Sequence, residues 1–226
     1  MGNNQIERKV LGIIGAGGLA REVLELAKQV NKAKDKWEKY VFIDRKPSDI
    51  EINGSPVYTY ELAKADFGDQ LEIVLGIGEP SKRERLFKEI KNDGIPTPSL
   101  IHPEVYIPTT TTIGLGVVIQ QGCFISCNVI IDDNVFIQPQ CNIGHDDVLE
   151  EGCVLAGFSN VGGLVHIGKY SYIGLSSAIK QTVSIGYYSV VGMGSMVHKD
   201  IPDEMIAMGN PARIVAKNEE KRIFGR

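Results

Sequence analysis

The chain has 226 residues and a formal net charge of −4, with 24 Lys and Arg against 28 Asp and Glu. Apolar residues make up 43% and charged residues 23%, a globular composition that excludes wholesale disorder. A net-acidic chain lacks the basic footprint that nucleic-acid binding needs, and its longest apolar stretches are too short and too Gly-rich to cross a bilayer.

The N-terminal residues 1–5 carry no cationic segment that leads into an apolar run, so we expect no secretory leader and a cytoplasmic protein. Glycine is abundant, with 25 residues, while aromatic residues amount to 7%. A globular chain this rich in glycine is expected to contain many tight turns.

The first third of the chain predicts a small Rossmann-like α/β domain, which we place at residues 1–98. Strands that alternate with helices are typical of a parallel sheet. Trp37 stands in a run of lysines, and we expect it on a solvated face. The expected strands are Lys9–Ile14, Tyr40–Ile43 and Leu71–Leu75, and the expected helices cover 19–30 and 80–91.

The loop Gly15–Gly18 ends the first strand and opens the first helix, so its N–H groups predict a cradle for an anion. Gly15, Gly17 and Ala20 match a G-x-G-x-x-G/A spacing, and Asp44 lies 24 positions beyond Ala20, near where a ribose-binding acid falls. Three interpretations stay open: a nucleotide-sugar diphosphate, NAD, or a tight turn without a ligand. About ninety residues is small for a dinucleotide site, which normally uses two such halves.

From Ile107 onward an aliphatic residue returns at every sixth position, sixteen times without an insertion. A period of six predicts three short strands per turn of a triangular parallel β-helix, with eighteen residues per coil and stacked strands about 4.8 Å apart. We place this domain, with a short C-terminal tail, at residues 99–226. The series is Ile107, Ile113, Ile119, Ile125, Ile131, Ile137, Ile143, Leu149, Leu155, Val161, Ile167, Ile173, Ile179, Ile185, Val191 and Val197.

A second inward site lies two positions before each aliphatic residue, and fifteen of its sixteen residues are small or β-branched. Asp147 is the single misfit. Cys123, Cys141 and Cys153 occupy this site, so we interpret them as packed, reduced thiols. A disulfide between Cys123 and Cys141, which stack one coil apart, is the alternative.

His145 is expected at an outward-facing turn, and Asp146 follows it directly. A carboxylate beside an imidazole can fix its orientation and stabilise its protonated form, so His145 is a general-base candidate; a solvated turn is the alternative. Gly163, next to Gly162, lies eighteen residues beyond His145, which predicts a bare N–H over the imidazole where an oxyanion can form. A glycine needed only for the turn is the alternative. No closely spaced histidine pair indicates a metal site.

The hexads, followed by GMGSMVHKDIPDEMIAMGNPARIV over residues 192–215, resemble the left-handed β-helix, hexapeptide-repeat acyltransferases. The segments IIGAGGLAREV, FID, GIGEPSKRERL, LIHP and GHDD narrow the resemblance to the sialic-acid O-acetyltransferase and nucleotide-amino-sugar N-acetyltransferase family. The resemblance implies a left-handed coil, acetyl-CoA as co-substrate without a metal, and a homotrimer with each CoA site between two coils.

The same resemblance implies roles for individual residues. It makes His145 the catalytic base and Asp146 its acidic partner. This chain has Val154 where some relatives have a second His, and Gln138 and Glu79 where some relatives have Asn. These differences bear on the identity of the acceptor sugar more than on the acyl transfer. The implied CoA contacts are Gly162, Gly163, Leu175, Met193, Asn210 and Pro211, and the implied nucleotide-sugar contacts are Gly15, Gly17, Gly18, Asp44, Arg45 and Gly78.

The sequence therefore predicts an acetyl-CoA-dependent enzyme that N-acetylates a nucleotide-linked amino sugar, such as a 4-amino-4,6-dideoxy sugar, by direct attack on the thioester with His145 as base. Three alternatives stay open: O-acetylation of sialic acid or a related sugar, a non-catalytic solenoid scaffold, and an NAD-dependent oxidoreductase.

Overall fold

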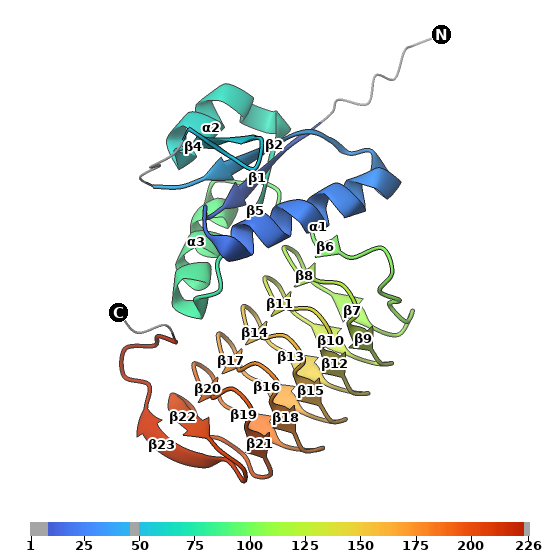
Figure 1. Cartoon of the computed structure of the whole chain (residues 1–226), viewed down its shortest axis with the longest axis vertical. Helices are drawn as coiled ribbons and strands as arrows, with labels where there is room; N and C mark the ends of the chain where they lie inside the picture. Colours follow the sequence, from blue (N-terminus) through green and yellow to red (C-terminus); the bar gives the residue numbers. More distant parts are fainter. Residues whose placement is uncertain (1–8, 46–49, 224–226) are drawn as a thin grey trace. The chain divides into compact units, whose positions relative to one another are not determined.

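The computed structural model describes residues 9–45 and 50–223. Residues 1–5, on which the expectation of no secretory leader rests, lie outside these ranges. The chain divides into two compact units, one of Met1–Ile77 with Lys88–Pro98 and the other of Gly78–Phe87 with Ser99–Arg226 (Figure 1).

The first unit contains a five-stranded sheet of order β3-β4-β2-β1-β5, in which only the short β3–β4 pair is antiparallel. The predicted parallel sheet is therefore confirmed. The strands are β1 (Lys9–Ile14), β2 (Trp37–Ile43), β3 (Glu51–Ile52), β4 (Ser55–Tyr58) and β5 (Leu71–Leu75), and the helices are α1 (Gly18–Lys34), α2 (Tyr60–Phe67) and the 3₁₀ turn η1 (Gly68–Gln70). Helix α3 (Pro80–Asn92) is divided between the two units, with residues 80–87 in the second.

Burial explains which of these elements the sequence predicts. Strand β1, between β2 and β5, and strand β5, at the edge of the sheet, are buried and mostly apolar, apart from Lys9 and Glu72, and α1 buries one apolar stripe. The expectation for Trp37 is wrong: its ring is 4% exposed, and its Nε1–H donates to Glu72 Oε2 at 2.9 Å. Strand β2 begins at Trp37, so this ring turns to the buried side while Glu38 and Lys39 stay exposed.

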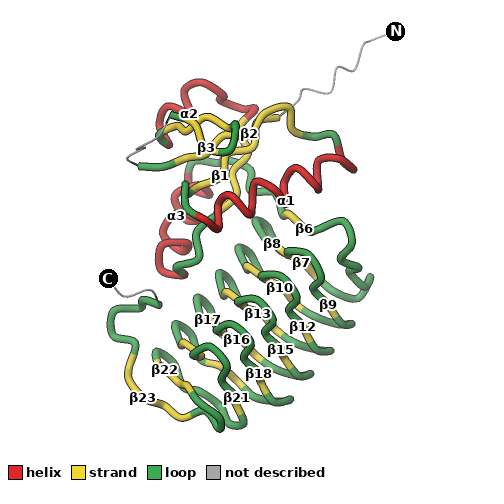
Figure 2. The backbone as a smooth tube through the Cα atoms, in the orientation of Figure 1, coloured by secondary structure: helices red, strands yellow, loops and turns green. Residues whose placement is uncertain are grey.

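The second unit is a left-handed parallel β-helix of three sheets (Figures 1 and 2). We call the sheet β21-β18-β15-β12-β9 the β12 face, the sheet β19-β16-β13-β10-β7 the β13 face, and the sheet β23-β22-β20-β17-β14-β11-β8-β6 the β14 face. The strands are β6 (Leu100–Ile101), β7 (Thr112–Ile113), β8 (Val118–Ile119), β9 (Phe124–Ile125), β10 (Ile130–Ile131), β11 (Phe136–Ile137), β12 (Asn142–Ile143), β13 (Val148–Leu149), β14 (Val154–Leu155), β15 (Asn160–Val161), β16 (His166–Ile167), β17 (Tyr172–Ile173), β18 (Ala178–Ile179), β19 (Ser184–Ile185), β20 (Val190–Val191), β21 (Met196–Val197), β22 (Met205–Met208) and β23 (Arg213–Lys217).

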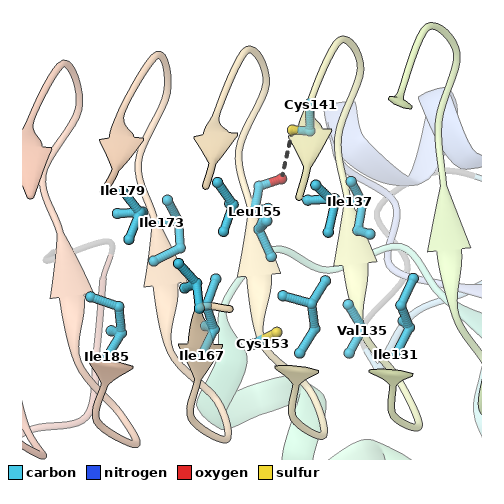
Figure 3. Close-up of a cluster of buried hydrophobic side chains, with 14 of the residues drawn as sticks. Ile131, Val135, Ile137, Cys141, Cys153, Leu155, Ile167, Ile173, Ile179 and Ile185 are labelled. Atoms are coloured by element: carbon cyan, nitrogen blue, oxygen red, sulfur yellow. Dashed lines mark hydrogen bonds between the residues drawn. The ribbon is translucent and has the colours of Figure 1, made fainter. Parts of the chain in front are cut away.

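The coil repeats at the predicted period of eighteen residues. Ile143 of β12 pairs with Ile125 on one side and Val161 on the other, and the other coils follow the same register. Figure 3 shows aliphatic side chains from successive strands pointing into the interior, where they form one continuous core. The packing predicted for Cys123, Cys141 and Cys153 is confirmed, because all three are buried.

The two ends of the coil differ from the simple hexad count. The coil starts earlier than the series, because Leu100 of β6 already pairs with Val118, while Ile107 belongs to no strand. At the far end the antiparallel pair β22–β23 closes the β14 face. Among the residues that the structure describes, no helix is long and apolar enough to cross a membrane.

Candidate active site

His145 lies on the edge between the β12 and β13 faces, in the turn that joins β12 to β13. Its imidazole is half exposed, as the spacing predicts, and its Nδ1 lies 2.7 Å from Asp146 Oδ2. Because an ionised carboxylate only accepts hydrogen bonds, Nδ1 carries the proton in this pair. The neutral ring therefore presents Nε2 as an acceptor.

Asp146 is held from two sides. Its Oδ2 accepts from His145, and its Oδ1 accepts from Asn128 Nδ2 at 3.0 Å, one coil earlier. These two hydrogen bonds, that of His145 first, lower the pKa of Asp146 from its ordinary value. Asn128 was not among the predicted site residues, although its position eighteen residues before Asp146 was a usable signal.

Gly163 lies directly against the imidazole. A Cβ placed on Gly163 would come 2.5 Å from His145 Nε2. A Cβ placed on Gly144 would come 2.5 Å from Gly163 N, and Leu164 N–H donates to His145 O at 2.9 Å. The two turns are therefore packed backbone to backbone, and no side chain separates the ring from the Gly163 peptide.

The amides equivalent to that of Gly163 in other turns are of two kinds: some donate to a side chain, and others, such as those of Leu175 and Gln181, donate to no acceptor within the described residues. Gly157 N–H donates to Gln138 Oε1 at 3.0 Å, Lys169 N–H to Glu150 Oε2 at 3.0 Å, and Tyr187 N–H to Asp203 Oδ1 at 3.0 Å. Within residues 9–45 and 50–223, the Gly163 N–H donates to no protein acceptor. It is therefore a donor that a ligand oxygen can use.

Asp147, the residue after the His145–Asp146 pair, points into the interior of the coil and is fully buried. Its Oδ1 accepts from Val165 N–H at 2.8 Å, one coil further along. Burial raises the pKa of Asp147 to about 6, and the nearby Val165 and Gly144 N–H groups oppose that shift.

The other predicted CoA contacts lie away from His145. Leu175 and Met193 project from the opposite edge of the β12 face and are 45% and 76% exposed. Asn210 and Pro211 lie in the turn between β22 and β23, which docks on the end of that face through hydrogen bonds between Met196 and its neighbours in the turn. The structure thus places Gly162 and Gly163 beside His145, Leu175 and Met193 across the β12 face from it, and Asn210 and Pro211 at the end of that face.

The first unit gathers most of the predicted nucleotide contacts at one edge of its sheet. Ile14 pairs with Ile43, so the loops that begin with Gly15 and with Asp44 leave the sheet together. Arg45, next to Asp44, is exposed. Ligands of open α/β sheets bind at this carboxyl edge.

The loop itself has the features of a phosphate cradle. Gly15 has a φ of 110°, which favours glycine, and Gly17 is the N-cap of α1. Nothing lies within 4 Å of a Cβ placed on Gly17 or Gly18, so both peptides open onto solvent. Gly76, after β5 and two residues before Gly78, packs against Ala20 so closely that a Cβ there would come 2.7 Å from Ala20 Cα. Small residues at both positions therefore bring α1 close to the sheet.

Within the part of the chain that the structure describes, no group of three or more His, Cys, Asp or Glu side chains is placed to hold a metal ion.

Residues 10–90 match the family model of the PglD N-terminal domain. The acetyltransferase domain of PglB from Neisseria gonorrhoeae, solved with acetyl coenzyme A, superposes with a TM-score of 0.86 at 27% identity, covering 92% of this chain and all of that one. PerB from Caulobacter crescentus, solved with CoA and GDP-perosamine, gives a TM-score of 0.81 at 28% identity over 93% of this chain and 98% of that one.

The curated relatives match the chain less completely. The acyl-[acyl-carrier-protein]–UDP-N-acetylglucosamine O-acyltransferase of Pseudomonas putida is 30% identical over 146 residues, which are 62% of this chain and 55% of that protein. The chain thus spans about half the length of the curated relatives it matches.

The left-handed coil is the fold of the left-handed β-helix acyltransferases. The match to the PglD N-terminal domain and the structural matches over nearly the whole chain show that the chain resembles sugar acetyltransferases of this fold.

Proposed function

We propose that the protein transfers the acetyl group of acetyl-CoA to the amino group of a nucleotide-linked sugar. The observation that carries this proposal is the contact between the imidazole of His145 and the peptide of Gly163. The proposal is supported by the PglB structure solved with acetyl coenzyme A and the PerB structure solved with CoA and GDP-perosamine.

The geometry suits a direct transfer. Nε2 of His145 accepts a proton from the acceptor amine as its nitrogen attacks the thioester carbonyl carbon. Asp146 holds Nδ1 protonated and stabilises the imidazolium that forms. The Gly163 N–H donates to the carbonyl oxygen as negative charge develops on it. When the carbon–sulfur bond breaks, the imidazolium returns the proton to the CoA thiolate, so no acyl-enzyme is needed.

The substrates are assigned to separate surfaces. We assign the phosphates of the acceptor to the N–H groups of Gly15–Gly18, at the start of α1. We assign acetyl-CoA to the β12 face, along which Leu175 and Met193 offer exposed apolar contacts. We also propose that the reaction takes place in the cytoplasm.

We also propose a homotrimer, as the family resemblance implies. Large apolar side chains remain exposed on the β12 and β13 faces, including Phe124, Ile130 and Met196, and a neighbouring subunit would cover such side chains. Size-exclusion chromatography with light scattering measures the molar mass of the protein in solution and tests this proposal. We expect three times the mass of one chain, and the mass of a single chain would contradict the proposal.

O-acetylation is the second candidate, because the Pseudomonas putida relative is named as an O-acyltransferase of a UDP-linked sugar. The same catalytic base would then take the proton of a sugar hydroxyl.

An acceptor panel tests both candidates. The purified protein is mixed with acetyl-CoA and with nucleotide-linked amino sugars, the matching hydroxy sugars, or free sialic acid, and CoA release is followed with a thiol reagent. We expect release with an amino sugar and a loss of at least about 100-fold in kcat for His145→Ala. Release with hydroxy sugars or sialic acid alone would favour the second candidate. Absence of release and of acetyl-CoA binding would indicate a scaffold, and NADH binding would indicate an oxidoreductase.

A further inference from the structure

Asp147 is a carboxylate placed inside an apolar column. Its side chain is fully buried, and so are Val129 and Val165, which stack with it on the two neighbouring coils, and Val183 one coil further along. Its Oδ2 makes no hydrogen bond within the described residues. A valine would fill the same site without the cost of burying a polar oxygen that lacks a partner, so packing does not explain Asp147.

In other coils the N–H equivalent to that of Val165 has one of two kinds of acceptor. Some donate to the carbonyl three residues earlier in their own turn, as Val183 N–H does to Lys180 O at 3.3 Å. Others donate to a hydroxyl one coil earlier, as Val129 N–H does to Thr111 Oγ1 at 3.3 Å and Ser189 N–H to Ser171 Oγ at 3.2 Å. Val165 N–H instead donates to Asp147 Oδ1 on the previous coil, at 2.8 Å. The turn that carries Gly163 is therefore tied to the segment that carries His145.

Two hydrogen bonds join these segments side by side. Leu164 N–H donates to His145 O at 2.9 Å, and Val165 N–H donates to Asp147 Oδ1 at 2.8 Å. Beside these bonds the imidazole lies against Gly163, where a Cβ would come 2.5 Å from Nε2. The second bond limits sliding of the Gly163 turn relative to the ring.

We propose that Asp147 is a positioning residue that clamps the Gly163 peptide against the His145 imidazole through its hydrogen bond to Val165. The proposal rests on the proposed acetyl transfer, in which both groups act on one thioester. Small displacements of such a pair lower kcat strongly, because the reacting atoms must be held in near-attack geometry.

The same column supplies a matched pair of variants. Thr111 Oγ1 accepts from Val129 N–H at 3.3 Å, so a threonine hydroxyl at this kind of site can make the equivalent bond. Asp147→Thr keeps an acceptor and removes the charge, whereas Asp147→Val has nearly the same shape and removes the acceptor. The two variants differ by the hydrogen bond alone.

Steady-state kinetics on full-length wild-type protein and both variants test the clamp. For Asp147→Val we expect kcat to fall by at least about 10-fold with the KM for acetyl-CoA within about threefold, and Asp147→Thr to stay within about threefold of wild type in both. A wild-type kcat in Asp147→Val would overturn the clamp. An equal loss of kcat in the two variants would also overturn it, because the charge and not the hydrogen bond would then matter.

A crystal structure of Asp147→Val separates failure of the clamp from failure of the proposed function. If the wild type transfers no acetyl group to any acceptor, the proposed function fails, yet the clamp still predicts that the Gly163 turn shifts away from His145 in the variant. An unshifted turn contradicts the clamp whatever the wild-type activity.

Discussion

The imidazole of His145 lies on the Cα of Gly163, one coil further along the β-helix, and a Cβ there would come 2.5 Å from Nε2. The contact puts a proton acceptor and a free peptide N–H on one edge of the coil. Because the coil is a rigid ladder of paired strands, the juxtaposition is built into the fold before any substrate binds.

Replacement of Gly163 tests the contact. The Cβ of Gly163→Ala would have to displace the imidazole, so we expect kcat to fall by at least about 10-fold with little change in Tm. Gly157→Ala is the matched control, because its Cβ would meet no atom closer than 3.3 Å, and its kcat should stay within about twofold. A fully active Gly163→Ala enzyme would show that the ring and the peptide do not act together.

Asp146 can be neutralised without disturbing its backbone. Asp146 has a φ of 59°, which asparagine tolerates well, so Asp146→Asn should fold normally. The pKa of Asp146 is held below its ordinary value by His145 and Asn128, so the native carboxylate is ionised at neutral pH. Without its charge to stabilise the imidazolium, kcat should fall by about 10-fold or more. Equal kcat values for the wild type and Asp146→Asn at all pH values near neutrality would show that the charge of Asp146 has no role in catalysis.

The architecture of the coil could be predicted almost completely from sequence, because a solenoid repeats one packing rule. Each inward aliphatic residue predicts the next, and eighteen residues of spacing place His145 below Gly163 without any long-range information. The ends could not be predicted in this way. Ile107 fits the series but lies in no strand, and β22–β23 leaves the repeat, because terminal coils lack a neighbour on one side.

The site was predicted less completely. The hexad count places Gly163 beside His145, but a residue's partners across coils depend on side-chain length and direction, so the role of Asn128 was missed. Asp147 stands out in the sequence as a misfit, yet only the structure shows that it accepts from Val165. The prediction for Trp37 was wrong for a similar reason. A lysine-rich run does not reveal that Glu72, on strand β5, accepts a hydrogen bond from the indole N–H.

Asp147 also makes a prediction for stability. Burial raises the pKa of Asp147 to about 6 from an ordinary 3.8, so between these pH values the folded chain binds a proton that the unfolded chain has lost. The contribution of this group to stability therefore falls as pH rises through that window, and the penalty is complete above it. Asp147→Val should be more stable than wild type by about 1–2 kcal/mol at neutral pH, after the lost hydrogen bond is counted, and the gain should shrink toward acid pH.

Thermal unfolding of the two proteins at matched concentration measures this difference, which should amount to a few degrees in Tm at neutral pH. A difference in Tm that stays constant from neutral to acid pH would mean that Asp147 titrates normally.

The glycine loop can be tested separately from the acetyl-transfer chemistry. A Cβ on Gly17 meets nothing within 4 Å, and its φ of −83° suits alanine, so Gly17→Ala should keep the wild-type Tm. The added methyl group would stand where we assign the acceptor phosphates, so the KM for a nucleotide-linked acceptor should rise by about fivefold or more. The KM for acetyl-CoA is the internal control and should not change. Unchanged KM values for both substrates would show that the nucleotide does not bind at this loop.

The proposed pairing of His145 and Gly163 can be seen in a crystal structure with acetyl-CoA bound. We expect the thioester carbonyl oxygen to lie within about 2.7–3.2 Å of Gly163 N, with His145 Nε2 facing the open side of the carbonyl carbon. A thioester bound away from that edge, or one whose oxygen accepts from another donor while Gly163 N–H stays unused, would contradict it.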